Sequence, residues 1–270
     1  MLFARANVSM NDLGMISTAR MQDYLLGGGD HFSFDRACVD DSPVIEWVRG
    51  VLLHDRTFLF SAMSFMLDRG IKQFLDLGSG IATMGGPLDV AEYLCREIRV
   101  VHVDNDIAVI EHGKLRARIG GQANAGFVHA NVLDADLVLW TAIREGILDL
   151  REPVGVLAIG LLHLIGPQQA PELVVPRYCA AFAAGSSAAI SHLTPGLALS
   201  HLDEVGRLLA GSNRCLHPRG ELEIKQMFGE LAIVEPGLMP LHHRVWTPGK
   251  SRGADIRPCA GLLAGVAIKV

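Results

Sequence analysis

The segment DLGSG at residues 76–80 combines residue types that can hold a nucleotide. An apolar run ends in Asp76, and Gly78 and Gly80 follow on either side of a serine. Glycine lets the chain turn tightly and approach a ligand, and a helix that starts here would offer free N–H groups. A dinucleotide fingerprint has a third glycine where this chain has Thr83, which argues against a nicotinamide cofactor. We interpret the segment as a nucleotide-binding turn, with an ordinary glycine turn as the alternative.

Asp104 ends the next apolar run along the chain, VVHVD. In nucleotide-binding α/β folds an acidic side chain at this place accepts hydrogen bonds from the ribose hydroxyls. The alternative is that one of residues 104–106 caps a helix that begins near Ile107. After the third apolar run, the Asn131 side chain and the Val132 N–H are candidates to contact an adenine edge, which is a weaker signal. Together these residues predict an adenosine site.

Two histidines follow later apolar runs, His163 after the fourth and His192 after the fifth. Open α/β sheets bind their ligands at the carboxyl ends of the strands, where both histidines are expected. An imidazole whose pKa lies near neutrality can act there as a general base. A lone histidine is more often a structural residue, so the catalytic and the structural interpretation both stay open. His163 is the favoured candidate.

The surrounding pattern predicts the elements that position these residues. Short apolar runs alternate with helix-length segments, which is typical of a parallel sheet covered by helices on both faces. Strands are expected at 73–77, 100–104, 126–130, 154–159 and 188–192, and helices at 87–96, 107–119, 137–146, 172–184, 201–209 and 219–228. A long helix is expected before them, with Pro43 in its first turn and Gly70 at its end. Late strands near 231–235 and 262–270 are expected to form an antiparallel edge.

Composition narrows the class of protein. The chain has 270 residues, 50% of them hydrophobic, and a net charge of −5, which supports a large core and disfavours nucleic acid as a partner. The longest apolar run, 154–165, is too short to span a membrane, and no signal peptide is evident. Five scattered cysteines form no CxxC pair, so we predict no metal site and expect free thiols in the cytoplasm. A small-molecule partner is expected, with a homodimer or a different partner protein left open.

Several segments occur in the order seen in an actinobacterial family of S-adenosyl methyltransferases. They are TARMQDYLLGGGDHFSFDR, DRTFL, GIKQFLDLGSGIAT, VVHVDND, LLHLI and ISHLTP. The resemblance runs roughly from Thr18 to Gly237, and the DYLLGG element makes it specific. It implies the class I methyltransferase (Rossmann-like) fold, a doubly wound, mostly parallel sheet with an antiparallel edge strand. A helical N-terminal cap at 1–70 and the Rossmann-like domain at 71–270 are expected to form one unit.

The resemblance also implies S-adenosyl-L-methionine as the cofactor and assigns residues to it. The methionine part would be lined by Asp76, Gly78, Ser79 and Gly80, and the ribose and adenine by Asp104, Asn105, Asn131 and Val132. The N-terminal element, which would cap the pocket, contributes Tyr24, Gly27 and Gly28. Arg56 matches an arginine that commonly follows an asparagine in the family, whereas here Asp55 precedes it. Met84 and Leu88 stand where the family has polar residues in its glycine loop.

Two functions follow from this resemblance. The first is methyl transfer from S-adenosylmethionine to a small molecule in secondary metabolism, with His163, His192 or Asp30 taking the proton of the acceptor. The second is a methyltransferase fold that has been repurposed in natural-product biosynthesis, because a fold does not dictate its function. That protein would be a cyclase-like or lyase-like enzyme, or a subunit that depends on a partner.

Overall fold

A computed structural model describes residues 16–81, 85–195, 199–210, 212, 214–241 and 261–270 of the chain. Within these residues one sheet contains the strands β1 (Gln73–Leu77), β2 (Arg99–Asp104), β3 (Ala125–His129), β4 (Val154–Ile159), β5 (Ser187–Leu193), β6 (Ala232–Ile233), β7 (Met239–Pro240) and β8 (Leu262–Ile268). The helices are α2 (Thr18–Leu25), α3 (Ser33–Ala37), α4 (Ile45–Asp68), α5 (Pro87–Tyr93), α6 (Ile107–Gly120), α7 (Ala135–Arg144), α8 (Val174–Ala181), α9 (Leu199–Ala210) and α10 (Glu221–Gln226).

The sheet is parallel over its first five strands and antiparallel beyond them. The strand order is β3-β2-β1-β4-β5-β8-β6, with β7 also paired to β8. β8 runs antiparallel to β5, and β6 and β7 run antiparallel to β8. The order reverses between β1 and β4, so the carboxyl ends of these strands border a topological switch point, where open α/β folds bind ligands. The expected doubly wound, mostly parallel sheet with an antiparallel edge is confirmed.

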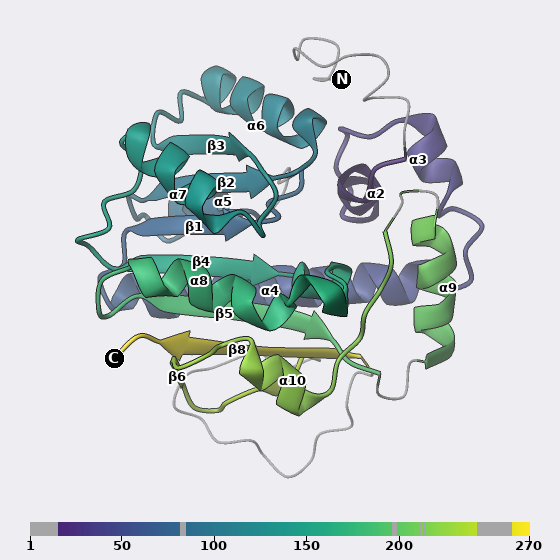
Figure 1. Ribbon diagram of the computed structural model, residues 1–270. Coiled ribbons are helices and arrows are strands. Elements are labelled where there is room, and N and C mark those ends of the chain that lie inside the picture. Colours follow the sequence, from purple (N-terminus) through teal and green to yellow (C-terminus); the bar gives the residue numbers. More distant parts are fainter. Residues whose placement is uncertain (1–15, 82–84, 196–198, 211, 213, 242–260) are drawn as a thin grey trace.

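Alternating side chains place a hydrophobic core on each face of the sheet. Leu75 and Val101 point to one face, and their neighbours Phe74 and Val100 point to the other. The first face is covered by α7, α8 and α10, and the second by α4 and α5. Figure 1 shows α8 in front of the sheet and α4 behind it. Since strands buried on both faces need apolar residues at nearly every position, the continuous apolar runs in the sequence are explained.

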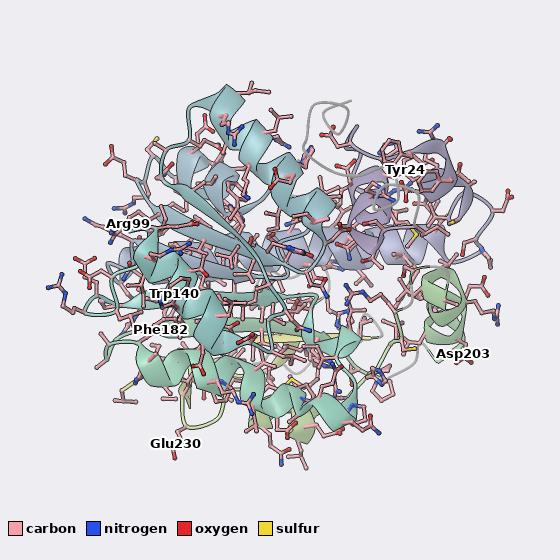
Figure 2. All side chains as sticks on the ribbon, turned by 45° about the horizontal axis from the view of Figure 1, so that its top comes forward. Tyr24, Arg99, Trp140, Phe182, Asp203 and Glu230 are labelled. Atoms are coloured by element: carbon pink, nitrogen blue, oxygen red, sulfur yellow. The ribbon has the colours of Figure 1, made fainter. Side chains whose placement is uncertain are left out.

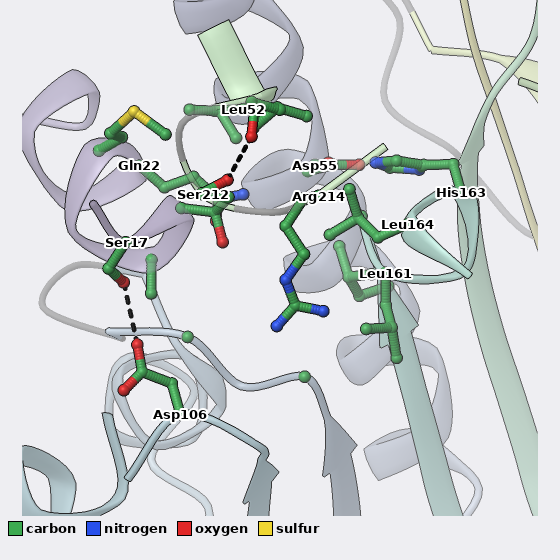
Figure 3. A pocket seen from close by; sticks show the side chains of 18 of the residues that line it. Ser17, Gln22, Leu52, Asp55, Asp106, Leu161, His163, Leu164, Ser212 and Arg214 are labelled. Atoms are coloured by element: carbon green, nitrogen blue, oxygen red, sulfur yellow. Dashed lines mark hydrogen bonds between the residues drawn. The ribbon is translucent and has the colours of Figure 1, made fainter. Parts of the chain in front are cut away.

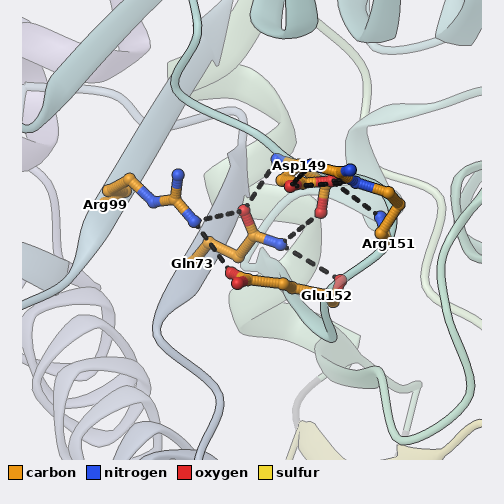
Figure 4. A network of polar contacts seen from close by, with 5 residues as sticks. All are labelled: Gln73, Arg99, Asp149, Arg151 and Glu152. Atoms are coloured by element: carbon orange, nitrogen blue, oxygen red, sulfur yellow. Dashed lines mark hydrogen bonds and ion pairs between the residues drawn. The ribbon is translucent and has the colours of Figure 1, made fainter.

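The amino ends of the strands are held by polar contacts around Gln73, whose side chain is buried. Its amide nitrogen donates to the carbonyl of Asp149 at 2.6 Å and to that of Glu152 at 3.1 Å. Its amide oxygen accepts from the Asp149 N–H at 2.9 Å and from Arg99 at 3.2 Å. Figure 4 shows how this amide joins β1 to the loop that precedes β4.

Tyr24 and Arg99 lie at opposite ends of the molecule in Figure 2, with Tyr24 on the side of the N-terminal helices.

The N-terminal helices lie at the carboxyl ends of the parallel strands. In Figure 1 the arrowheads of β1, β2, β4 and β5 point to the side where α2, α3 and α9 lie. Ser17 caps α2, and a fully buried ion pair at 2.7 Å joins Arg20 to Asp35. The Asp35 carboxylate also accepts the N–H groups of Ser17 and Phe32, so it is fully partnered despite its burial. These contacts give the N-terminal element a defined conformation.

Element boundaries differ from the sequence predictions in places where local signals were incomplete. Pro43 precedes α4 instead of lying in its first turn, because Val44 is the N-cap. The helix expected at 172–184 is reduced to α8, preceded by the 3-10 turns η2 (Leu162–Leu164), η3 (Pro167–Gln169) and η4 (Pro171–Leu173). Ala170, in the left-handed region at φ 48°, separates η3 from η4. No described helix has the length and hydrophobicity that a membrane crossing requires.

Candidate active site

A cavity of about 550 Å³ opens between the carboxyl ends of the strands and the helices α2, α4 and α9. This volume lies within the range of roughly 300–1,000 Å³ that is usual for small-molecule sites. Ten of the predicted site residues line it, namely Arg56, Asp76, Gly78, Ser79, Gly80, Asp104, Asn105, Asn131, Val132 and His163. Figure 3 shows Arg214 extending into the middle of this space, with Asp55 and His163 on one side and Ser17 and Asp106 on the other.

The glycine turn after β1 takes the backbone conformation that its sequence indicates. Gly78 and Gly80 have φ angles of 66° and 57°, in the left-handed region that favours glycine. A β-carbon at Gly78 would lie 2.5 Å from Cδ1 of Leu161, so the turn packs directly against the second residue after β4. The N–H groups of Gly78 and Ser79 donate to the carbonyl of Val103 at 2.8 and 3.0 Å, which holds the turn against β2.

Asp104 meets the glycine turn at the end of β2. Its carboxylate accepts the N–H of Gly80 at 3.0 Å and that of Asp106 at 2.9 Å. Burial raises the pKa of Asp104, while the two backbone donors act in the opposite direction. The helix cap is a different residue, because the Asp106 side chain accepts the N–H of Ala108 at the start of α6. Asp106 is therefore the helix cap, and Asp104 lines the cavity, where its contact with a ribose stays a prediction.

Asp76 and His102 form a buried pair across β1 and β2. Nδ1 of His102 lies 3.0 Å from Oδ2 of Asp76, and the His102 ring stacks on Phe127 at a centroid distance of 5.1 Å. This contact orients the Asp76 carboxylate at the bottom of the cavity. A partner for Asp76 was not predicted from the sequence, although the strand register places His102 directly beside it.

The surroundings of His163 favour a neutral imidazole. Its Nδ1 accepts the N–H of Leu193 at 3.4 Å, so the ring proton is on Nε2. Burial lowers the pKa of His163 well below its ordinary value, and nearby His192 and Arg219 act in the same direction. A neutral ring with this tautomer is suited to donate a hydrogen bond into the cavity. The proposed role as general base stays a prediction that these contacts disfavour.

His192 is fully buried and does not line the cavity. Its Nδ1 donates to the carbonyl of Leu193 at 2.6 Å, and its Nε2 accepts from Arg219 at 3.1 Å. Burial lowers the pKa of His192 to about 4. Arg219 also donates to the carbonyls of Leu162 and Ile165 at 3.0 and 2.6 Å. His192 and Arg219 therefore join β5, the turn after β4 and the segment after α9, which corresponds to the structural interpretation.

The predicted residues of the N-terminal element lie beside the cavity and are not part of its lining. The Tyr24 hydroxyl donates to Asp40 at 2.6 Å on the outer side of α2. Gly27 ends α2 at φ 82°, and the N–H of Gly28 donates to the carbonyl of Asp23 at 2.8 Å. Asp30 pairs with His112 of α6 at 3.0 Å. The contacts of these residues lie within the N-terminal element or join it to α6. Their functional roles stay predictions.

Besides the helix cap Asp106, the lining contains two charged residues, Asp55 and Arg214, that were not predicted from the sequence. Asp55 lies on α4 and is 7% exposed, although the residues one helical turn away on either side, 51, 52, 58 and 59, are apolar. Arg214, after α9, donates to the side-chain oxygen of Asn105 at 2.8 Å. The signal for Asp55 in the sequence was a charged residue on the apolar face of a predicted helix. Nothing near Arg214 in the sequence connects it to β2, which is more than 100 residues earlier.

Residues 6–270 match the family described as S-adenosyl methyltransferase. The chain belongs to this S-adenosyl methyltransferase family. A candidate methyltransferase from Thermobifida fusca YX is similar at 29% identity and a TM-score of 0.80, over 94% of this chain and 95% of that one. A DUF574 family protein from Streptomyces avermitilis MA-4680 has 29% identity and a TM-score of 0.82, over 96% and 99% of the two chains.

A more distant similarity confirms the class I fold of this S-adenosyl methyltransferase. Magnesium protoporphyrin IX methyltransferase from Synechocystis PCC 6803, with bound S-adenosylmethionine, has 12% identity and a TM-score of 0.53 over 98% of this chain and all of that one. No curated protein matches the chain in sequence. The family identifies S-adenosylmethionine as the cofactor.

The residues of the cavity fit this cofactor. A carboxylate at Asp104 and the amide of Asn131 line the cavity together with the glycine turn, a donor and acceptor set suited to an adenosyl group. Leu88 lines a separate cavity of about 60 Å³ behind the turn and does not fill the main one. Thr83 and Met84 lie outside the described residues. The departure from the family pattern at Leu88 therefore leaves the main cavity open.

Proposed function

We propose that this S-adenosyl methyltransferase transfers a methyl group to a small, largely apolar molecule of secondary metabolism. The observation that carries the proposal is the convergence of the glycine turn and Asp104 on one wall of a cavity whose opposite wall is apolar. A cavity of this kind supports a hydrophobic metabolite as the acceptor better than a highly charged one. Within the part of the chain that the structure describes, the lining of the cavity gives no support to the repurposed, non-methylating alternative.

We assign the binding residues as follows. Asp104 accepts the ribose hydroxyls, Asn105 flanks the adenine, and Asn131 with the Val132 N–H contacts its edge. The turn at Gly78, Ser79 and Gly80 holds the methionine part together with Asp76, and Arg56 is a cationic partner for its carboxylate. When bound, the cofactor supplies a methyl group activated by its sulfonium charge. The protein then needs mainly to hold donor and acceptor in line and to exclude water.

The test is calorimetric titration with S-adenosylhomocysteine. We expect the wild-type protein to bind it and Asp104→Ala to weaken binding by about 10- to 100-fold, the effect of a lost charge-assisted hydrogen bond. Asp136→Ala, at an exposed position of α7, is the matched control and should bind as the wild type does. Absence of binding to the folded wild-type protein at millimolar ligand would refute the proposed function.

A further inference from the structure

The wall of the cavity opposite the strand ends is built from apolar side chains of three helices. Met21 and Leu25 come from α2, Val48 and Leu52 from α4, and Val205 and Leu209 from α9. Such a lining favours a ligand with a hydrocarbon body, because transfer of apolar surface out of water stabilises binding. The glycine turn and Asp104 are on the other wall, so this part of the cavity is available to the acceptor.

Asp55 is a carboxylate within this apolar wall. It faces the end of β4, since a β-carbon on Gly160 would lie 3.0 Å from Oδ2 of Asp55. A hydrogen bond from the Ser191 hydroxyl supports the carboxylate, and that hydroxyl accepts the N–H of Gly160 at 2.8 Å. Asp55 is thereby held beside the residues that pack on the glycine turn, next to the reactive end of the proposed cofactor site.

One oxygen of Asp55 is left without a partner. Its Oδ1 is shielded from solvent and accepts no hydrogen bond from any described residue. The other carboxylates of the lining are partnered: Asp76 by His102, Asp104 by two backbone N–H groups, and Asp106 by Ser17 and Ala108. A buried acceptor without a donor is unfavourable, and a ligand N–H or O–H group removes that penalty when the carboxylate of Asp55, a lining residue, turns this oxygen toward the cavity. Burial also raises the pKa of Asp55 to about 6.

We propose that Asp55 recognises the methyl acceptor, a hydrophobic molecule that presents a hydroxyl or amine group to its carboxylate. The apolar wall holds the hydrocarbon body, and Asp55 holds the donor group at the end of β4. This inference rests on the proposed function for the identity of the ligand as a methyl acceptor. It assigns to Asp55 a contact with the reacting group, whereas Arg56 beside it contacts the cofactor.

Three matched probes test this assignment by calorimetry, with and without S-adenosylhomocysteine. They are 4-butylphenol, 4-butylbenzylamine and 4-butylanisole, which share an apolar body and carry a hydroxyl, an amine and no donor. We expect the wild-type protein to bind the phenol or the amine about tenfold or more tightly than the anisole. Of the phenol and the amine, the probe whose affinity exceeds that of the anisole by the larger factor shows whether the methyl acceptor carries a hydroxyl or an amine. Equal binding of all three probes overturns the inference.

Asp55→Leu should bind the three probes within about twofold of one another, because its side chain is apolar. Asp68→Asn, at the exposed end of the same helix, should keep the wild-type preference. If Asp55→Leu fails to fold, Asp55→Asn keeps the shape of the side chain and should lose about tenfold in affinity for the amine. A donor preference that survives in Asp55→Leu, or an amine affinity that is unchanged in Asp55→Asn, contradicts the role of Asp55. A wild-type protein that fails to bind S-adenosylhomocysteine refutes the proposed function instead, and the probe series then still decides whether Asp55 recognises a donor group of a hydrophobic ligand.

Discussion

At the scale of single residues, burial decides the chemistry of the titratable groups around the cavity. His163 and His192 each have one ring nitrogen that accepts a hydrogen bond, and burial lowers the pKa of both. Asp55 is affected in the opposite direction, since burial disfavours its charged form and raises its pKa. Near neutral pH the histidines are uncharged and Asp55 is the ionised group. The carboxylate is therefore a better hydrogen-bond acceptor in this cavity than either imidazole.

The shifted pKa of Asp55 predicts a pH-dependent stability. Its pKa is raised from 3.8 to about 6 in the folded protein, so the folded state binds more protons than the unfolded state between these values. The resulting penalty is absent below pH 3.8 and complete above about pH 6, and it amounts to about 3 kcal/mol at 1.36 kcal/mol per unit. Asp55→Asn should therefore raise the free energy of unfolding at pH 8, with a smaller gain near pH 4.5. Urea unfolding of the wild type and the variant at both pH values measures this difference. An equal change in the free energy of unfolding at pH 4.5 and pH 8 would contradict the prediction.

At the scale of elements, two polar clusters fix the strands at opposite ends. Gln73 joins the amino end of β1 to the loop before β4, as Figure 4 shows. Arg219 joins the turn after β4 to the segment after α9 at the carboxyl end. The side chains of Gln73 and Arg219 satisfy backbone groups in loops that no strand pairing reaches. Arg219 thereby ties the turn after β4, which borders the cavity, to the sheet, and Gln73 does the same for the loop at the opposite end.

Substitution of Gln73 tests the first of these clusters. Gln73→Leu keeps the volume and removes all the hydrogen bonds of the amide, which leaves the Asp149 and Glu152 backbone groups unpartnered. We expect the free energy of unfolding to fall by about 1–3 kcal/mol. The control is Arg151→Ala in the same loop, whose 89% exposed side chain pairs with Asp149 at the surface and should contribute little to the free energy of unfolding. Equal stability of Gln73→Leu and the wild type would show that solvent satisfies these groups.

At the scale of the whole molecule, α4 belongs to the core of the sheet as much as to the N-terminal cap. Its residues Phe58, Met63 and Met66 pack in one cluster with Phe74 of β1 and Leu157 of β4. Its first half lines the cavity, α2 packs against it, and α3 packs against α2. This continuity supports the prediction that residues 1–70 and 71–270 form one cooperative unit.

Unfolding of a core variant of α4 tests that unity. Met63→Ala removes a fully buried side chain and should lower the free energy of unfolding by about 2–5 kcal/mol. The transition should remain single, with helix and sheet signals lost together in circular dichroism and tryptophan fluorescence. Leu53→Ala, at a half-exposed position of α4, should change stability by less than about 0.5 kcal/mol. Two separate transitions would instead show that the cap unfolds on its own.

Local patterns in the sequence were enough to determine the sheet, the glycine turn and the position of Asp104. Apolar periodicity and glycine conformation depend on neighbouring residues, so they can be read without a structure. The tertiary structure alone decided that Asp55 lies beside Gly160, that Arg214 reaches Asn105 and that His192 pairs with Arg219. These contacts join residues far apart in the chain, and burial and hydrogen-bond partners arise only when the chain has folded. For that reason the sequence indicated a cofactor site, whereas the candidate acceptor site became visible only in the structure.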